Sequence, residues 1–105
     1  MSEPVVRISQ GFFAPGLAER VAATLDAGHA TLDPALRALH GLLHYYVSID
    51  ADSASMVNVS VWESLAAAKQ MDTLKAMLAQ RDVFVGLGVT FQPIRNYSGL
   101  WSISA

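Results

Sequence analysis

Met56-Val57-Asn58-Val59-Ser60-Val61-Trp62-Glu63-Ser64 is the stretch of this sequence that decides the fold. It alternates as a β-strand does, because side chains two residues apart on a strand lie on the same face. One face carries only Val57, Val59 and Val61, and the other carries Met56, Asn58, Ser60 and Trp62. A tryptophan that closes a row of amide and hydroxyl groups indicates that this second face is covered too. We therefore predict that it lines an enclosed cavity with a few polar groups, as ligand pockets do.

The composition predicts one small domain that hides part of its surface in a dimer. The 105 residues fit a single domain over residues 1–105. Hydrophobic residues make up 52% and charged residues only 15%, which is more apolar material than so small a domain buries easily. A homodimer that covers one face of a sheet would resolve this excess.

Several classes of function are excluded or disfavoured by the same composition. A formal net charge of -2 gives no basic footprint for nucleic acid. The absence of cysteine removes disulfides, thiolate metal sites and a cysteine nucleophile. The first residues lack the apolar core of a signal peptide, and no apolar run reaches membrane-spanning length. We expect a cytoplasmic protein with neither a membrane nor a nucleic acid as partner.

The remaining elements are predicted from periodicity and from turn residues. A first strand is predicted over Val5 to Phe13. A helix follows from Leu17 to about Ala27 and ends at Gly28. A short helical turn then runs from Asp33-Pro34 to about Leu39. A second strand, Leu42 to Ile49, joins the Ser55 to Trp62 strand through a polar loop, as an antiparallel hairpin. Ser64 caps a helix that runs from Leu65 to about Ala79. A connection over Asp82 to Gly88 leads to a fourth strand, Val89 to Tyr97, which Pro93 interrupts. An apolar tail follows from Gly99 to Ile103.

This order of strand, helix, strand, strand, helix, strand predicts an α+β fold of the ferredoxin-like, split βαβ type. Both helices then cover one face of a four-stranded antiparallel sheet, and two copies pack their bare faces into a dimeric α+β barrel. The hairpin register stays open, with Ile49 or Asp50 opposite Met56. A shift of one residue decides which face His44 and Tyr46 use.

A strand that ends Asn58-x-x-x-Trp62-Glu63-Ser64 and leads into an alanine-rich helix resembles the antibiotic biosynthesis monooxygenase (ABM) domain family. Pro15-Gly16 at the start of the first helix, Gly41 before the second strand and Ser48-Ile49-Asp50 at its end fit the same resemblance. The resemblance covers nearly the whole chain and implies a dimeric α+β barrel. It also implies a monooxygenase that oxidises an aromatic or polyketide-like small molecule with O2, without metal or other cofactor.

The resemblance implies some of the residues of the site, and the sequence itself suggests the others. Asn58 and Trp62 match an asparagine and a tryptophan that line the substrate pocket in the quinone-forming members, where an amide and an indole N–H can donate to an oxyanion. We predict that Asn58, Trp62 and His44 are catalytic, with His44 as a base near neutral pH. The predicted substrate contacts are Tyr46, Ser60, Met71 and Arg81, with Arg95 the next candidate for the family's arginine.

The sequence departs from the family at Ala68, where the best-matching members carry a tyrosine on the helix. That role is absent here or moves to Tyr45, Tyr46 or Tyr97. Two alternatives therefore stay open, namely a non-catalytic or stress-responsive barrel that only binds a small ligand, and an isomerase of the same fold.

No metal site is predicted. His40 and His44 are four residues apart, but in a strand their Cα atoms lie about 13 Å apart, too far for one ion. The haem-degrading relatives need an axial histidine on the second helix, and Leu65 to Ala79 contains none.

Overall fold

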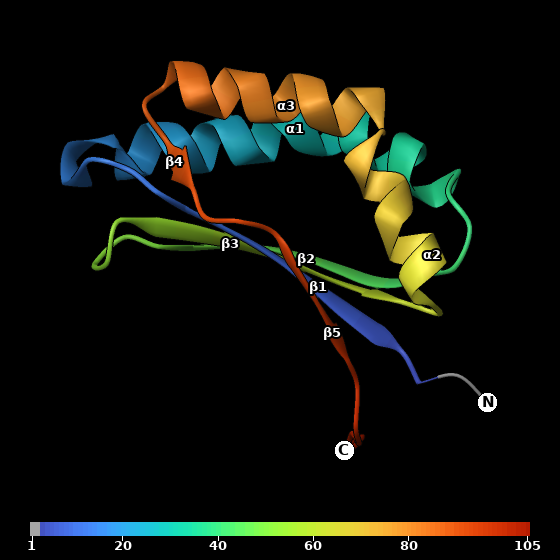
Figure 1. Cartoon of the computed structure of the whole chain (residues 1–105). Helices are drawn as coiled ribbons and strands as arrows, with labels where there is room; N and C mark the ends of the chain where they lie inside the picture. Colours follow the sequence, from blue (N-terminus) through green and yellow to red (C-terminus); the bar gives the residue numbers. More distant parts are fainter. Residues whose placement is uncertain (1–2) are drawn as a thin grey trace.

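A five-stranded antiparallel sheet lies beneath a layer of helices in the computed structural model, which describes residues 3–105 (Figure 1). The strands are β1 (Val5–Phe12), β2 (Leu42–Asp50), β3 (Ser55–Trp62), β4 (Thr90–Phe91) and β5 (Arg95–Ser98). The helices are α1 (Ala18–Arg37), α2 (Leu65–Lys69) and α3 (Lys75–Gly86), with 3-10 turns at Pro15–Leu17 and Gln70–Asp72. The α+β, ferredoxin-like fold predicted from the element order is confirmed.

The sheet is built around the first strand. Its order is β2-β3-β1-β4, and β5 also pairs with β1. The predicted fourth strand is split, because β4 and β5 flank Pro93, which has no N–H to donate to a neighbouring strand. The backbone N–H of Gln92 still donates to the Gln10 carbonyl, 2.8 Å away, so the two short strands follow the same partner.

The hairpin register places Ile49 opposite Met56, one of the two registers left open by the sequence. A bulge between Leu42 and His44 lies at the start of β2, away from the hairpin loop. His44 then lies opposite Val61 and Tyr46 opposite Val59. Since directly paired residues share a face, both side chains belong to the valine face, which points away from the helices.

The first helix is longer than predicted. Gly28 does not end it, and α1 continues through Pro34 to Arg37, so that the two predicted helical pieces are one. Gly28 is buried where α1 meets α3, and a Cβ atom there would lie 2.5 Å from Nε2 of Gln80. The glycine therefore serves the close approach of the two helices rather than a helix end.

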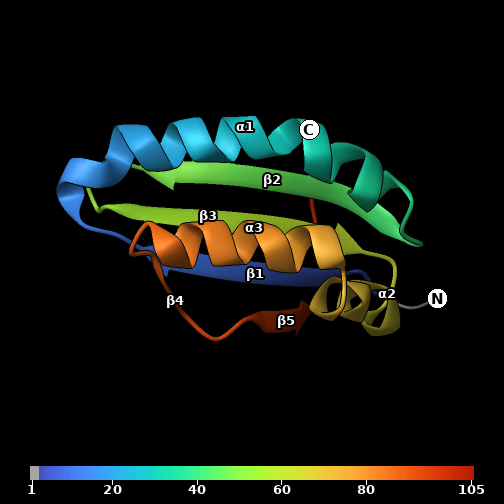
Figure 2. The same ribbon diagram turned by 90° about the horizontal axis from the view of Figure 1, so that it is seen from above.

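The second helical region is broken where the sequence predicted one helix over Leu65 to Ala79. It consists of α2, the 3-10 turn Gln70–Asp72 and α3, and α3 extends to Gly86 through the segment predicted as a connection. Ser64 caps α2 as predicted, its Oγ accepting from the Ala67 N–H at 3.1 Å. The break lets α2 cover one end of the sheet while α3 lies beside α1 (Figure 2).

The core between helices and sheet consists of two separate clusters. One contains Trp62 together with Val5, Leu36, Ala67, Ala68 and Met71. The other contains Met56 together with Phe13, Val21, Ala54, Phe84 and Val89. This division leaves room in the layer between them.

Among residues 3–105, no helix lies over the opposite face of the sheet (Figure 1). Val57, Val59 and Val61 are only partly buried there, and Tyr46 is 54% exposed. The tail after Gly99 has no regular secondary structure, and its Trp101 is 79% exposed. Within residues 3–105, the helices are all too short or too polar to cross a membrane.

Candidate functional site

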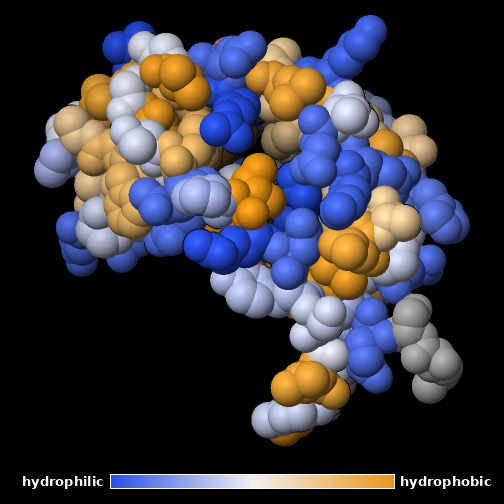
Figure 3. Space-filling view, viewed as in Figure 1, coloured by the Kyte–Doolittle hydropathy of each residue, from blue (hydrophilic) through white to orange (hydrophobic). Residues whose placement is uncertain are grey.

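A pocket of about 980 Å³ lies between the sheet and the helices. Its size is at the upper end of the range for small-molecule sites, about 300–1,000 Å³. Figure 3 shows the surface hollowed between the helical layer and the sheet. The polar groups that line it from the sheet are Arg7, Ser9, Tyr45, Asn58 and Ser60, and apolar lining comes from residues such as Leu36, Val47, Met71, Met77 and Phe84.

Asn58 is the central polar residue of this wall. It lies on β3 between Ser9 of β1 and Val47 of β2, and its side chain faces the helices. Its Oδ1 atom is buried and has no hydrogen-bond partner among the described residues. An unpaired buried acceptor costs about 1–3 kcal/mol, so Asn58 holds an unused hydrogen-bonding group next to the pocket.

Trp62 is part of the core rather than of the lining. It is completely buried in the cluster with Ala67 and Ala68, and it is absent from the residues that line the pocket. Its indole Nε1–H donates to Oγ of Ser60 at 2.8 Å. The two side chains are neighbours on one face of β3, so the indole donor is already used within the strand.

Tyr45 is a pocket residue that the sequence left among three candidate tyrosines. The register places it opposite Ser60 and on the helix-facing side of β2. Burial raises the pKa of the Tyr45 phenol to about 12, although the charge of Arg7 and a hydrogen bond with Asn58 act to lower it. The phenol is therefore neutral at physiological pH and acts as a donor, not as a base.

Arg7 is a pocket residue that the sequence analysis missed. Its side chain is only 6% exposed, and its Nη2 lies 2.7 Å from Oδ1 of Asp72. Nη1 also donates to Oδ1 of Asn96 at 3.5 Å. A buried charge needs such partners. Asp72 is distant in sequence, which is why the strand pattern alone did not identify an inward-facing arginine.

His44 and Tyr46 lie differently from the predicted site. Their rings stack on each other, with centroids 6.0 Å apart, on the valine face of the sheet. His44 still borders the pocket near the β2 bulge, whereas Tyr46 does not line it. The other candidate tyrosine, Tyr97, lies opposite Val6 and therefore on the same outer face.

The remaining predicted contacts lie on the pocket wall. Ser60, Met71 and Arg81 all line it. Met71 is buried beside Trp62, and the guanidinium of Arg81 lies 5.1 Å from the centroid of the Phe91 ring, a distance typical of a cation–π contact. Arg95, the second candidate arginine, pairs opposite Ile8 and belongs to the outer face.

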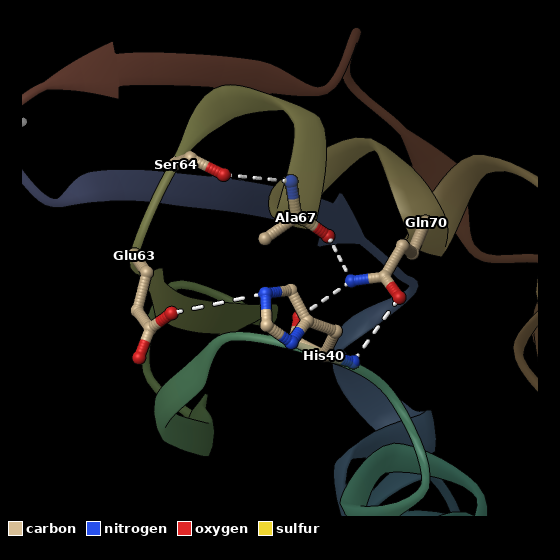
Figure 4. A network of polar contacts seen from close by, with 5 residues as sticks. All are labelled: His40, Glu63, Ser64, Ala67 and Gln70. Carbon is tan, nitrogen blue, oxygen red and sulfur yellow. Dashed lines mark hydrogen bonds and ion pairs between the residues drawn. The ribbon is translucent and has the colours of Figure 1, made fainter.

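A polar network closes the end of the molecule beside α2 (Figure 4). The Gln70 side chain accepts from the His40 N–H at 3.1 Å and donates to the His40 and Ala67 carbonyls at 2.6 and 2.7 Å. His40 Nε2 also lies 4.0 Å from Oε2 of Glu63. The network fixes the start of β2 to α2. Over residues 3–105, no group of three histidine, aspartate or glutamate side chains is placed to hold a metal ion.

Comparisons with solved structures confirm the likeness to ABM structures at the level of the fold. SnoaB from Streptomyces nogalater, described as a cofactor-independent oxygenase, aligns with a TM-score of 0.70 at 15% identity, over 99% of this chain and 100% of that chain. A candidate antibiotic biosynthesis monooxygenase from Deinococcus radiodurans aligns with a TM-score of 0.69 at 22% identity, over 97% of both chains.

PA3566 from Pseudomonas aeruginosa aligns with a TM-score of 0.67 at 26% identity, over 96% of this chain and 98% of that chain. Neither a protein-family model nor a curated protein sequence matches this chain.

Proposed function

We propose that the protein is a cofactor-independent monooxygenase that oxidises a small aromatic, polyketide-like molecule with O2. The observation that carries the proposal is the pocket, which has an apolar wall from the helices and, on the sheet, the amide of Asn58, whose Oδ1 has no partner among residues 3–105. The fold shared with a cofactor-independent oxygenase supports it.

The chemistry needs little from the protein. A polycyclic phenol that has lost a proton is electron-rich enough to reduce O2 itself. One oxygen atom enters the ring carbon, so that CH₂ and O2 give C=O and H2O, which balances atoms and electrons. The protein binds the phenol, favours its anion through hydrogen-bond donors and excludes water.

The proposed contacts are Asn58, Ser60, Met71 and Arg81, which all line the pocket. His44, at the border of the pocket, is the proposed base. Trp62 acts through packing and through its bond to Ser60, because its N–H does not reach the cavity. Tyr46 does not line the pocket and is left out of the proposal.

Oxygen consumption tests this proposal. We expect metal-free purified protein to consume O2 with anthrone-type phenols. Asn58→Ala removes the amide Nδ2–H₂ group and should slow the reaction about 100-fold, as loss of one oxyanion donor does elsewhere. Gln92→Ala removes an exposed amide between β4 and β5 and serves as the matched control. Uptake that never exceeds background over a panel of such phenols would overturn the proposal.

We propose further that the protein works in the cytoplasm as a homodimer, in which the valine face of one copy packs on that of another. The half-exposed Tyr46 and Tyr97 and the partly buried valines are the apolar surface that this contact would cover. Light scattering at micromolar concentration should give the mass of a dimer, and Val59→Asp should give a monomer. A monomeric parent protein would contradict the arrangement.

A second candidate function is ligand binding without catalysis. Two observations favour it, namely that Ala68 is fully buried against the Trp62 cluster and that the indole donor is bonded to Ser60. This candidate predicts a small apolar molecule retained in native mass spectrometry and no turnover.

A further inference from the structure

A row of polar side chains crosses the middle of the sheet at one end of the pocket. Arg7 of β1 pairs opposite Ser60 of β3, and Ser60 pairs opposite Tyr45 of β2. All three face the helices and line the pocket. Asn58 lies on the same face, two residues before Ser60, and its side chain contacts the Tyr45 phenol.

Most of the groups in this row are donors. Of the five N–H groups of a guanidinium, the described contacts of Arg7 use one on Asp72 and one on Asn96. The Ser60 hydroxyl accepts from Trp62 and so keeps its proton for another partner. The Tyr45 phenol is kept neutral by burial, so its O–H can donate a hydrogen bond.

Arg7 is the only charged residue of this row. Arg7 is almost fully buried, whereas the carboxylate that balances it, on Asp72, is 53% exposed and partly solvated. Asp72 also lines the pocket, as do other carboxylates, so the preference for a negative group is local to this row. It comes from the N–H groups of Arg7 that Asp72 and Asn96 do not use and from the Tyr45 O–H.

We propose that Arg7 and Tyr45 are ligand-binding residues that together hold an anionic oxygen atom of the molecule in the pocket. The inference rests on the proposed function only in that a small molecule occupies this pocket. It adds a preference for an ionised hydroxyl or carboxylate over its neutral counterpart. It also assigns a ligand contact to Arg7, which the sequence analysis missed, and to Tyr45, which was one of three candidate tyrosines.

Binding of paired probes tests this without any turnover. The first pair is 2-hydroxy-1,4-naphthoquinone, an anion at neutral pH, and its neutral methyl ether. The second pair is 2-naphthoate and 2-naphthamide. We expect each anion to bind at least about tenfold more tightly than its neutral partner, because a hydrogen bond to a charged group is worth about twice a neutral one. Preference in only one pair identifies whether a ring hydroxyl or a carboxylate is the natural group.

Three variants locate the preference. Tyr45→Phe removes only the O–H and should lower the anion-to-neutral affinity ratio several-fold while the neutral probe binds unchanged. Arg7→Lys keeps the charge but loses the planar fork and should lower the same ratio. Tyr97→Phe is the matched control on the outer face and should leave the ratio as in the parent protein.

The inference is overturned if anion and neutral probe bind equally well in both pairs, or if the anion-to-neutral affinity ratio is unchanged in Tyr45→Phe. Failure of both anions to bind counts against it as well. If Arg7→Lys does not fold, Tyr45→Phe still decides. The outcome is separate from that of oxygen consumption. Anion preference without O2 uptake refutes only the oxygenase, and O2 uptake without anion preference refutes only the roles of Arg7 and Tyr45.

Discussion

The bond between Trp62 and Ser60 gives the sharpest prediction about stability. Trp62 is completely buried, and its Nε1–H donates to Ser60 Oγ at 2.8 Å. In Ser60→Ala the indole donor stays in the core with no acceptor and no access to water. An unsatisfied buried donor costs about 1–3 kcal/mol, so we expect the free energy of unfolding to fall by about 2 kcal/mol. For a chain of 105 residues, this lowers Tm by about 8 °C.

Urea unfolding at fixed protein concentration, followed by tryptophan fluorescence, measures this change. Ser9→Ala is the control, since Ser9 lies on the same face opposite Asn58 and its hydroxyl has no described hydrogen bond within residues 3–105. Its free energy of unfolding should change by less than about 0.5 kcal/mol. Combining Ser60→Ala with Trp62→Phe isolates the pair, because the phenylalanine has no donor to leave unpaired. A loss in Ser60→Ala no larger than in Ser9→Ala would refute the reasoning.

Two further predictions concern Tyr45 and Gln70. Because the pKa of Tyr45 is raised to about 12 from 10.0, its contribution to stability is full below pH 10 and is lost as the pH rises to 12. Over this pH range, we expect the free energy of unfolding to fall by about 2–3 kcal/mol more in the parent protein than in Tyr45→Phe, measured by denaturant titration at each pH. Equal losses in the two proteins would contradict the pKa shift. Gln70→Ala removes three hydrogen bonds to His40 and Ala67. It should lower the free energy of unfolding by about 1–2 kcal/mol in the same assay. A loss below about 0.3 kcal/mol would show that the network does not stabilise the fold.

Local pattern was enough to predict the central strand. The Ser55 to Trp62 strand has the predicted bounds, because strict alternation of valines with other residues leaves no competing periodicity. Gly41, with φ +80, separates helix from strand as predicted. The element order then gave the fold, since few topologies accommodate it.

Contacts between distant residues explain the errors. Gly28 carries a helix-stop signal, but its role is set by Gln80 on another helix. The bulge at Leu42/His44 shifts the pairing at the far end of the hairpin, and no residue in the strand indicates it. The predicted Leu65 to Ala79 helix breaks at a turn whose Gln70 bonds to the backbone before β2.

The candidate site was predicted in part for the same reason. Ser60, Met71 and Arg81 were predicted as substrate contacts, and each lines the pocket, although nothing yet tests binding to them. Arg7 was missed because an arginine in an alternating strand is usually solvated. Its burial depends on Asp72 and Asn96, which lie 65 and 89 positions away.

The position of β1 in the sheet has a consequence for how the chain is made. This first strand pairs with β3 and also with β4 and β5, which leave the ribosome after all the other helices and strands described above. The β2–β3 hairpin needs only a short loop and can form early, whereas β1 keeps one edge unpaired until β4 and β5 have been made. The order of synthesis therefore makes the apolar N-terminal strand the segment most in need of protection from aggregation in the nascent chain.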